Sequence, residues 1–111
     1  MDCLFCKIAR KELPAKIVYE DDLIMAFDDI HPKATHHKLI IPHKHIATLN
    51  DLTKNDTQLA GHMLYTAQQI AKQLNIADDG YRVVMNVNEG GGQMVFHIHL
   101  HVLGGKFFGW P

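Results

Sequence analysis

Apolar and polar positions recur along the chain in patterns that predict one long helix. From Thr53 onward, apolar residues return at steps of three and four; they are Leu59, Met63, Ala67, Ile70 and Leu74. This period places them on one face of an amphipathic helix of about six turns. Thr53 with Asp56 is a start signal, and Asp78-Asp79-Gly80 is a turn after the helix. Gly61 lies inside this segment and costs roughly 1 kcal/mol unless a close helix contact, such as one across a dimer, needs it.

Shorter β-branched and apolar runs predict strands. We expect strands over residues 17–19, 23–27, 37–41, 81–88 and 94–103, the last two joined as a hairpin by the glycine-rich residues 89–93. A short helix is expected within residues 3–13, ending where Pro14 enforces extended backbone at Leu13. The prediction is an α+β fold in a single domain, residues 1–111, with about five mainly antiparallel strands and the long helix on one face.

Composition narrows the class of protein. The chain has 111 residues, 47% of them hydrophobic, and a net charge of −1, so it offers no basic surface for nucleic acid. No apolar run approaches the roughly 18 residues of a membrane helix, and Met1-Asp2-Cys3 begins without a charged n-region or an apolar h-region. We therefore expect a cytoplasmic protein with no nucleic-acid or membrane partner.

Histidine is the residue type that points to chemistry. Nine histidines occur, and three alternate with apolar residues in FHIHLHVLGG at residues 96–105. In a strand, alternation puts His97, His99 and His101 on one face, with same-face neighbours roughly 6.5–7 Å apart. The intervening apolar residues, Phe96, Ile98, Leu100 and Val102, would then pack on the core.

Two functions fit this histidine row. In one, His-x-His supplies two ligands to a catalytic zinc, with a third histidine elsewhere, as in a metallohydrolase. In the other, one histidine is a nucleophile toward phosphorus and its neighbours hold the phosphate. Residues 90–93, Gly-Gly-Gly-Gln, favour phosphate chemistry because glycines let backbone N–H groups approach an anion closely.

The two cysteines lie in CLFC, as Cys3 and Cys6. In a reducing compartment this spacing indicates metal binding or redox chemistry more than a structural disulfide. A thioredoxin-like redox motif should follow a strand, and only two residues precede Cys3. Metal binding is the preferred interpretation, with free thiols as the alternative.

The stretch HIHLHVL resembles the signature of the histidine triad (HIT) superfamily, and GGQMVFHIHLHVLGG resembles its Hint branch. The segments IARKELPAKIVYEDD, AFDDIHP, HKLIIPHKHI and DGYRVVMN, with Gly109-Trp110-Pro111, are similar to that branch too. The resemblance implies a homodimer joined in one extended sheet. It also implies hydrolysis of the P–N bond in purine nucleoside phosphoramidates, so that the partners are AMP or GMP derivatives.

By the same resemblance, His99 corresponds to the nucleophile that forms a nucleotidyl-histidine intermediate, with its ring N–H held by the carbonyl of His97. His101 corresponds to a donor to the phosphate, and His37 to an orienting residue. Backbone amides around Gly92, Gln93 and Met94 would stabilise the phosphoryl oxygens, and the Gln93 side chain would meet the leaving group.

Four further residues match the family's substrate site. Asp29 would accept hydrogen bonds from the ribose hydroxyls, with Ile30 beside the base and ribose. Asn86 lies where the family has a nucleotide-contacting asparagine. Trp110 would line the active site of the partner protomer, because the C-terminus of the Hint branch reaches toward it.

Other histidine triad proteins carry a Cys-x-x-Cys that binds zinc, and here the matching ligands would be Cys3, Cys6, His45 and His97. Four protein ligands leave no open position, so the zinc would be structural. His43 competes with His45 for this role, and only the resemblance favours His45.

Three alternatives to a phosphoramidase stay open. The first is a dinucleoside polyphosphate hydrolase or nucleotidyl transferase of the same superfamily. The second is a nucleotide-binding regulatory or interaction protein, which would need no unhindered nucleophile. The third is the metallohydrolase described above.

Overall fold

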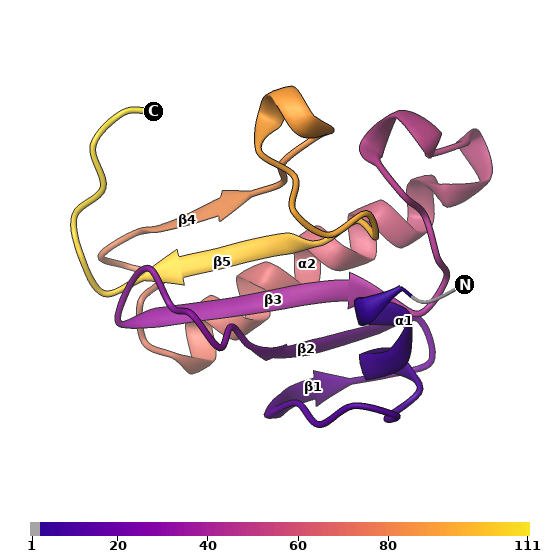
Figure 1. The fold of residues 1–111 in the computed structure, drawn as a ribbon. Helices are drawn as coiled ribbons and strands as arrows, with labels where there is room; N and C mark the ends of the chain where they lie inside the picture. The colour runs from indigo at the N-terminus through magenta and orange to yellow at the C-terminus, as the bar shows by residue number, and fades with distance from the viewer. Residues whose placement is uncertain (1–2) are drawn as a thin grey trace.

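The computed structural model describes residues 3–111, which form one five-stranded antiparallel sheet flanked by helices (Figure 1). The strands are β1 (Ile17–Glu20), β2 (Ile24–Asp28), β3 (His36–Pro42), β4 (Tyr81–Val84) and β5 (Leu100–Gly104), in the spatial order β1-β2-β3-β5-β4. The helices are α1 (Leu4–Ala9) and α2 (Thr57–Gln73), with 3-10 turns at Leu49–Asp51, Lys54–Asp56 and Glu89–Gly91. The expected α+β class is confirmed.

The central strands β2 and β3 pack against a different helix on each face of the sheet. Ile24, Ala26 and Ile40 point to the face covered by α2, where Met63 and Ile70 pack on them. The alternate residues of the same strands point to the other face and pack against α1; this second cluster contains Phe5, Ile8, Met25, Phe27, Leu39 and Ile41. Strand alternation thus sorts the central strands into two cores, because successive side chains face opposite ways.

The expected long helix is present but starts later than the start signal at Thr53 indicates. Thr53 and Asp56 form a reciprocal capping box, as the start signal predicted, but the box caps the 3-10 turn at Lys54–Asp56. The α-helix proper, α2, begins at Thr57. None of the helices within residues 3–111 is long and apolar enough to span a membrane.

The expected strand over residues 94–103 is wrong in its first half. The ladder begins only at Leu100, and β4 ends at Val84, which pairs with His101. Before Leu100 the chain bonds elsewhere, since the N–H of Ile98 donates to the carbonyl of Ile46 at 2.7 Å. The triad therefore straddles the start of a strand. Alternation still sends Ile98, Leu100 and Val102 into the core on α2, but Phe96 is 44% exposed and outside it.

Candidate active site and metal centre

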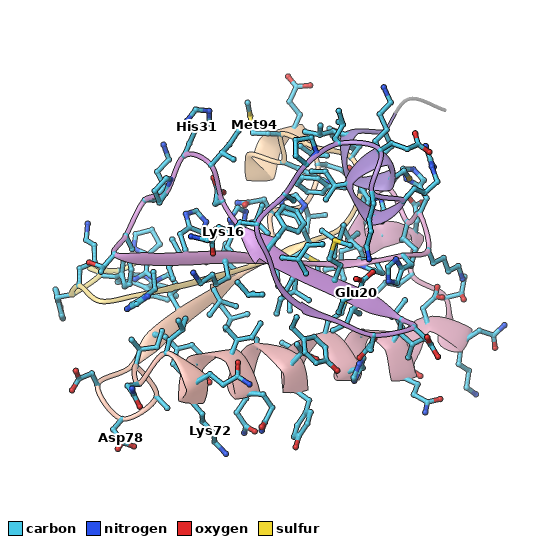
Figure 2. All side chains as sticks on the ribbon, turned by 90° about the horizontal axis from the view of Figure 1, so that it is seen from below. Lys16, Glu20, His31, Lys72, Asp78 and Met94 are labelled. Carbon is cyan, nitrogen blue, oxygen red and sulfur yellow. The ribbon has the colours of Figure 1, made fainter. Side chains whose placement is uncertain are left out.

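A cavity of about 990 Å³ opens on the sheet face opposite α2, and three of the expected site histidines line it: His37, His99 and His101. Figure 2 shows the sheet edge-on, with the cavity-lining residues His31 and Met94 on one side and Lys72 of α2 on the other. The volume suits a small organic ligand. The sheet floor, α1 and the loop after β2 thus enclose the histidines in one pocket.

His99 is held in a single orientation at the centre of this cavity. Its Nδ1–H donates to the carbonyl of His97 at 2.8 Å, and the ring of Phe5 meets it edge-on, with centroids 5.0 Å apart. Burial lowers the pKa of His99, which favours the neutral ring. In that ring Nε2 carries the lone pair, and no residue within 3–111 hydrogen-bonds to it. His99 therefore has the geometry of a nucleophile.

A chain of hydrogen bonds fixes the tautomers of His37 and His101. The backbone N–H of Lys33 donates to Nδ1 of His37 at 3.0 Å, so the proton of the neutral ring sits on Nε2. That Nε2–H donates to Nδ1 of His101 at 2.8 Å. Burial, followed by the neighbouring His99 and His37, lowers the pKa of His101 to about 4. A neutral His101 that accepts at Nδ1 must carry its proton on Nε2, where it can donate to a ligand.

Asp29 lies at the edge of the same group. One carboxylate oxygen accepts the N–H of His31 at 2.7 Å, and the other lies 3.4 Å from Nε2 of His37. Ile30 and Asn86 also line the cavity, Ile30 with 85% of its surface exposed. The Asn86 side-chain amide donates to the carbonyl of Gly91, which ties the segment after β4 to the glycine-rich loop.

Polar groups of the glycine-rich loop form hydrogen bonds within the protein. The backbone N–H groups of Gly92 and Gln93 donate to the carbonyls of Glu89 and Asn88. The Gln93 side chain is buried, donating to the carbonyls of Ala47 and Val95 and accepting the N–H of Asn88. Gln93 does not line the cavity, so the structure places it as a brace of the loop and not against a leaving group. Gly92 and Met94 do line the cavity.

The C-terminal segment lies beside its own protomer's cavity. After β5 it runs past the edge strand β4 (Figure 1), where Arg82 donates to the carbonyls of Gly109 and Pro111. Lys106 and Phe108 line the cavity, whereas Trp110 does not and is 97% exposed. Trp110 is therefore outside the site of its own chain.

The four expected metal ligands come together beside the active-site cavity. Nδ1 of His97 lies 3.3 Å from Sγ of Cys3, 3.5 Å from Sγ of Cys6 and 3.3 Å from Nδ1 of His45. A tetrahedral zinc with ordinary bond lengths separates its nitrogen and sulfur ligands by roughly 3.3–3.8 Å. All four donor atoms lie within 4.8 Å of one another. The group fits a tetrahedral ion without rearrangement.

The surroundings of this group also suit a cation. His97 is fully buried, and its Nε2–H donates to the carbonyl of Pro42 at 2.8 Å, which leaves the lone pair on Nδ1 facing the sulfurs. Burial and the neighbouring Cys3 raise the pKa of Cys6, so a bound cation would be needed to hold the Cys6 sulfur as a thiolate. His43 lies elsewhere, donating to the carbonyl of Asp21.

The sequence did not lead us to expect two residues, Phe5 and Lys33, in the cavity. Phe5 sits between the two cysteines and contacts both His97 and His99, at ring-centroid distances of 6.0 and 5.0 Å. Its spacing of three from Ile8 on a short helix was the one available clue. Lys33 orients His37 through its backbone N–H, and no side-chain pattern could have indicated that contact.

Comparisons with known proteins agree with this arrangement. The HIT domain family model matches residues 10–108. The chain is 51% identical over 108 residues to the purine nucleoside phosphoramidase of Escherichia coli (strain K12), covering 97% of this chain and 91% of that protein. A HIT family hydrolase from Legionella pneumophila Philadelphia 1 superposes with a TM-score of 0.97 at 54% identity, covering 99% and 98% of the two chains. A histidine triad protein from Clostridium difficile gives 0.96 at 40% identity, covering 100% and 96%. The chain belongs to the HIT domain family.

Proposed function

We propose that the protein hydrolyses the P–N bond of purine nucleoside phosphoramidates, of AMP or GMP type, through a covalent intermediate on His99. The observation that carries this proposal is the 2.8 Å hydrogen bond from Nδ1–H of His99 to the carbonyl of His97, which leaves Nε2 as an unprotonated nucleophile in the cavity. The name of the Escherichia coli relative supports the substrate class.

The reaction would proceed in two displacements. Nε2 of His99 attacks phosphorus and forms a new P–N bond as the bond to the substrate amine breaks, and the expelled amine takes a proton from water. The hydroxide left by that water then attacks phosphorus as the bond to Nε2 breaks, which releases the nucleoside monophosphate and restores His99. In both steps the Nε2–H of His101 donates to a phosphoryl oxygen, where negative charge develops.

The remaining cavity residues would bind the ribose, the nucleoside and the phosphate of the substrate. The Asp29 carboxylate would accept hydrogen bonds from ribose hydroxyls, with Ile30 against the nucleoside. Beside the loop, Met94 presents a backbone N–H that has no hydrogen-bond partner within residues 3–111, and it lines the cavity, so we assign it to the phosphate. Gly92 lines the cavity within that loop, Asn86 supports the loop through the carbonyl of Gly91, and buried Gln93 braces it.

Cys3, Cys6, His45 and His97 would hold a structural zinc. When bound, the ion would supply a fixed crosslink between α1 and the triad, with no open position for water. In this arrangement His97 keeps its carbonyl aimed at His99, and α1 keeps Phe5 packed on the His99 ring. Thiolate ligands persist in a reducing compartment, which supports a cytoplasmic location.

We also propose a homodimer. The edge strand β4 has hydrogen-bonding capacity on one side, because β5 is its only neighbour in the sheet formed by residues 3–111. On α2, Leu64 and Tyr65 are 56% and 60% exposed. A second protomer would cover these apolar side chains. Within the dimer, Trp110 of one protomer would reach the partner's cavity.

Mass spectrometry of protein quenched during turnover of an adenosine phosphoramidate tests the central claim. We expect a nucleotidyl adduct on the peptide that contains His99, absent from a His99→Gly variant. A His62→Gly variant, altered at a histidine outside the cavity, is the matched control and should form the adduct. Substantial turnover by His99→Gly, abolished by zinc removal from still-folded protein, would favour a metallohydrolase instead.

A further inference from the structure

We infer that the preferred substrates are phosphoramidates whose leaving amine carries a carboxylate, bound at the end of the cavity formed by Lys33 and Lys106. This inference rests on the proposed function and specifies the leaving group, which that function leaves undefined. It comes from the uneven distribution of charge along the cavity.

The two ends of the cavity differ in chemistry. At one end the wall is apolar and comes from α1, through Leu4, Phe5 and Ile8. At the other end the wall is cationic, formed by Lys33, Arg82 and Lys106. An apolar wall suits a purine base, whereas a cationic wall suits an anion.

The nucleophile lies between these ends. Along β5, His101 pairs with Leu39 and Val84, and Leu103 pairs with His37 and Arg82. Lys106 follows Gly105, whose carbonyl accepts the hydroxyl of Thr35 in the Lys33 loop. The order along the floor is therefore α1, His99, His101 and then the cationic end. In-line attack by His99 on a nucleotide whose base lies against α1 directs the departing amine toward the lysines.

The two lysines are available to a ligand. Within residues 3–111, neither Lys33 nor Lys106 makes an ion pair, whereas Lys38 is paired with Asp28 and Lys44 with Asp56. The Nζ atom of Lys106 lies 5.6 Å from the ring centroid of Phe108, a contact that leaves its charge unneutralised. These lysines are the positive charges of the cavity that remain free for a substrate.

Arg82 has a different role at the same end. It donates to the carbonyls of Gly109 and Pro111, and its guanidinium lies 4.9 Å from the Phe108 ring centroid. Arg82 thereby fastens the C-terminal segment that carries Lys106. We treat it as a positioning residue and not as a contact for the leaving group.

The acidic groups of the cavity make their own contacts, and within residues 3–111 neither forms an ion pair with Lys33 or Lys106. Asp28 is engaged with Lys38, and Asp29 is engaged with His31 and His37 beside the triad. A carboxylate on the leaving amine would meet two unpaired ammonium groups, and an ammonium group there would be repelled. Because both lysines are exposed, each contact contributes little, and we expect an overall preference of about three- to tenfold.

The test compares two adenosine phosphoramidates of nearly equal size, one with glycine and one with glycinamide as the leaving amine. The measured quantity is kcat/KM for the glycine compound divided by kcat/KM for the glycinamide compound. At low salt this ratio should be about three- to tenfold higher for the wild-type protein than for a Lys33→Gln/Lys106→Gln variant. The ratio of the variant reports the intrinsic reactivity of the two compounds. Raising the ionic strength should reduce the preference, because exposed charges are screened. Lys54→Gln/Lys72→Gln removes the same charge away from the cavity and should keep the wild-type ratio.

Each outcome has a defined meaning. Equal ratios in the wild type and the cavity double variant overturn this inference and leave the proposed function intact. Failure to hydrolyse either compound overturns the proposed function, and this inference falls with it. Diadenosine triphosphate, turned over faster than the glycine compound and in a lysine-dependent way, would reassign the cationic end to phosphate.

Discussion

The Nε2 atom of His37 lies 2.8 Å from Nδ1 of His101, and the backbone N–H of Lys33 holds the far side of the His37 ring. A backbone N–H can only donate, so the direction of every proton in this chain of hydrogen bonds is determined. The orientation of the proton that His101 offers to a substrate thus originates in the loop after β2.

Replacing His37 by alanine should lower kcat/KM about tenfold, the cost of one lost hydrogen bond that selects the productive tautomer. Nitrogen NMR of the His101 ring should show a mixture of tautomers, whereas the wild type shows the Nε2–H form alone. His36→Ala alters the neighbouring histidine, which does not line the cavity, and should retain both properties. An unchanged single tautomer in His37→Ala would refute this role of His37.

The metal centre yields a paired prediction. At the proposed zinc site, His45→Gln should abolish most zinc binding, whereas His43→Gln should retain about one zinc per chain, because His45 lies with the two cysteines and His43 does not. A strong chelator should lower Tm of the wild type by about 10 °C or more, because a tightly bound ion stabilises only the folded state. Elemental analysis and thermal unfolding measure these effects. Loss of zinc in His43→Gln would contradict the assignment.

Much of this architecture was predictable from local pattern. The 3.6-residue period located the long helix, and the β-branched runs located all five strands. The start of β5 was not predictable, because apolar alternation through residues 96–102 looks the same whether or not a partner strand is present. The N–H of Ile98 is taken by the carbonyl of Ile46, a long-range contact that leaves no trace in the local sequence.

In the candidate site, too, some features were predictable from the sequence and others were not. Histidine alternation identified the triad, and the family resemblance supplied the ligands that the structure brings together. Neither the alternation nor the resemblance indicated that the buried Gln93 amide would hydrogen-bond to the surrounding backbone. They also did not indicate that Lys106 and Phe108 would line the cavity of their own chain. Those placements depend on how loops pack after the sheet has formed, and side-chain identity alone does not encode them.

Asp21 should stabilise the fold in a pH-dependent way. Its carboxylate accepts hydrogen bonds from the hydroxyl of Tyr19, Nε2 of His62 and the backbone N–H groups of Leu23 and Ile24. Burial alone would raise the pKa of Asp21, but these hydrogen bonds lower it well below its usual range. The folded state then binds its proton less readily than the unfolded state does. The stabilisation is fully present well above the unfolded pKa of about 3.9. It begins to weaken as pH falls below that value and disappears only as pH falls through the lower pKa of the folded state.

We therefore expect Asp21→Asn to lower the free energy of unfolding by about 2 kcal/mol at pH 7. The difference from wild type should shrink below pH 4. Urea denaturation at pH 7 and at pH 3.5 measures both. Asp22→Asn, altered at the exposed neighbouring carboxylate, should change stability little at either pH. A deficit in Asp21→Asn that persists undiminished at pH 3.5 would show that its charge is not the cause.

The exposed face of α2 offers a test of assembly. Leu64 is 56% exposed on this helix, and Gly61, one turn earlier, has open space around the position of an added Cβ. If a partner protomer packs there, Leu64→Lys should bury a charge and reduce the mass in light scattering from two chains to one. Leu23→Lys changes a leucine of similar exposure, 49%, between β1 and β2 and should leave the dimer intact.

In an isolated protomer Gly61→Ala would raise the free energy of unfolding by about 1 kcal/mol, since alanine favours helix and meets no neighbour. A dimer packed on Gly61 would instead be weakened by the added methyl group, so a monomer-like gain in stability would exclude this face as the interface.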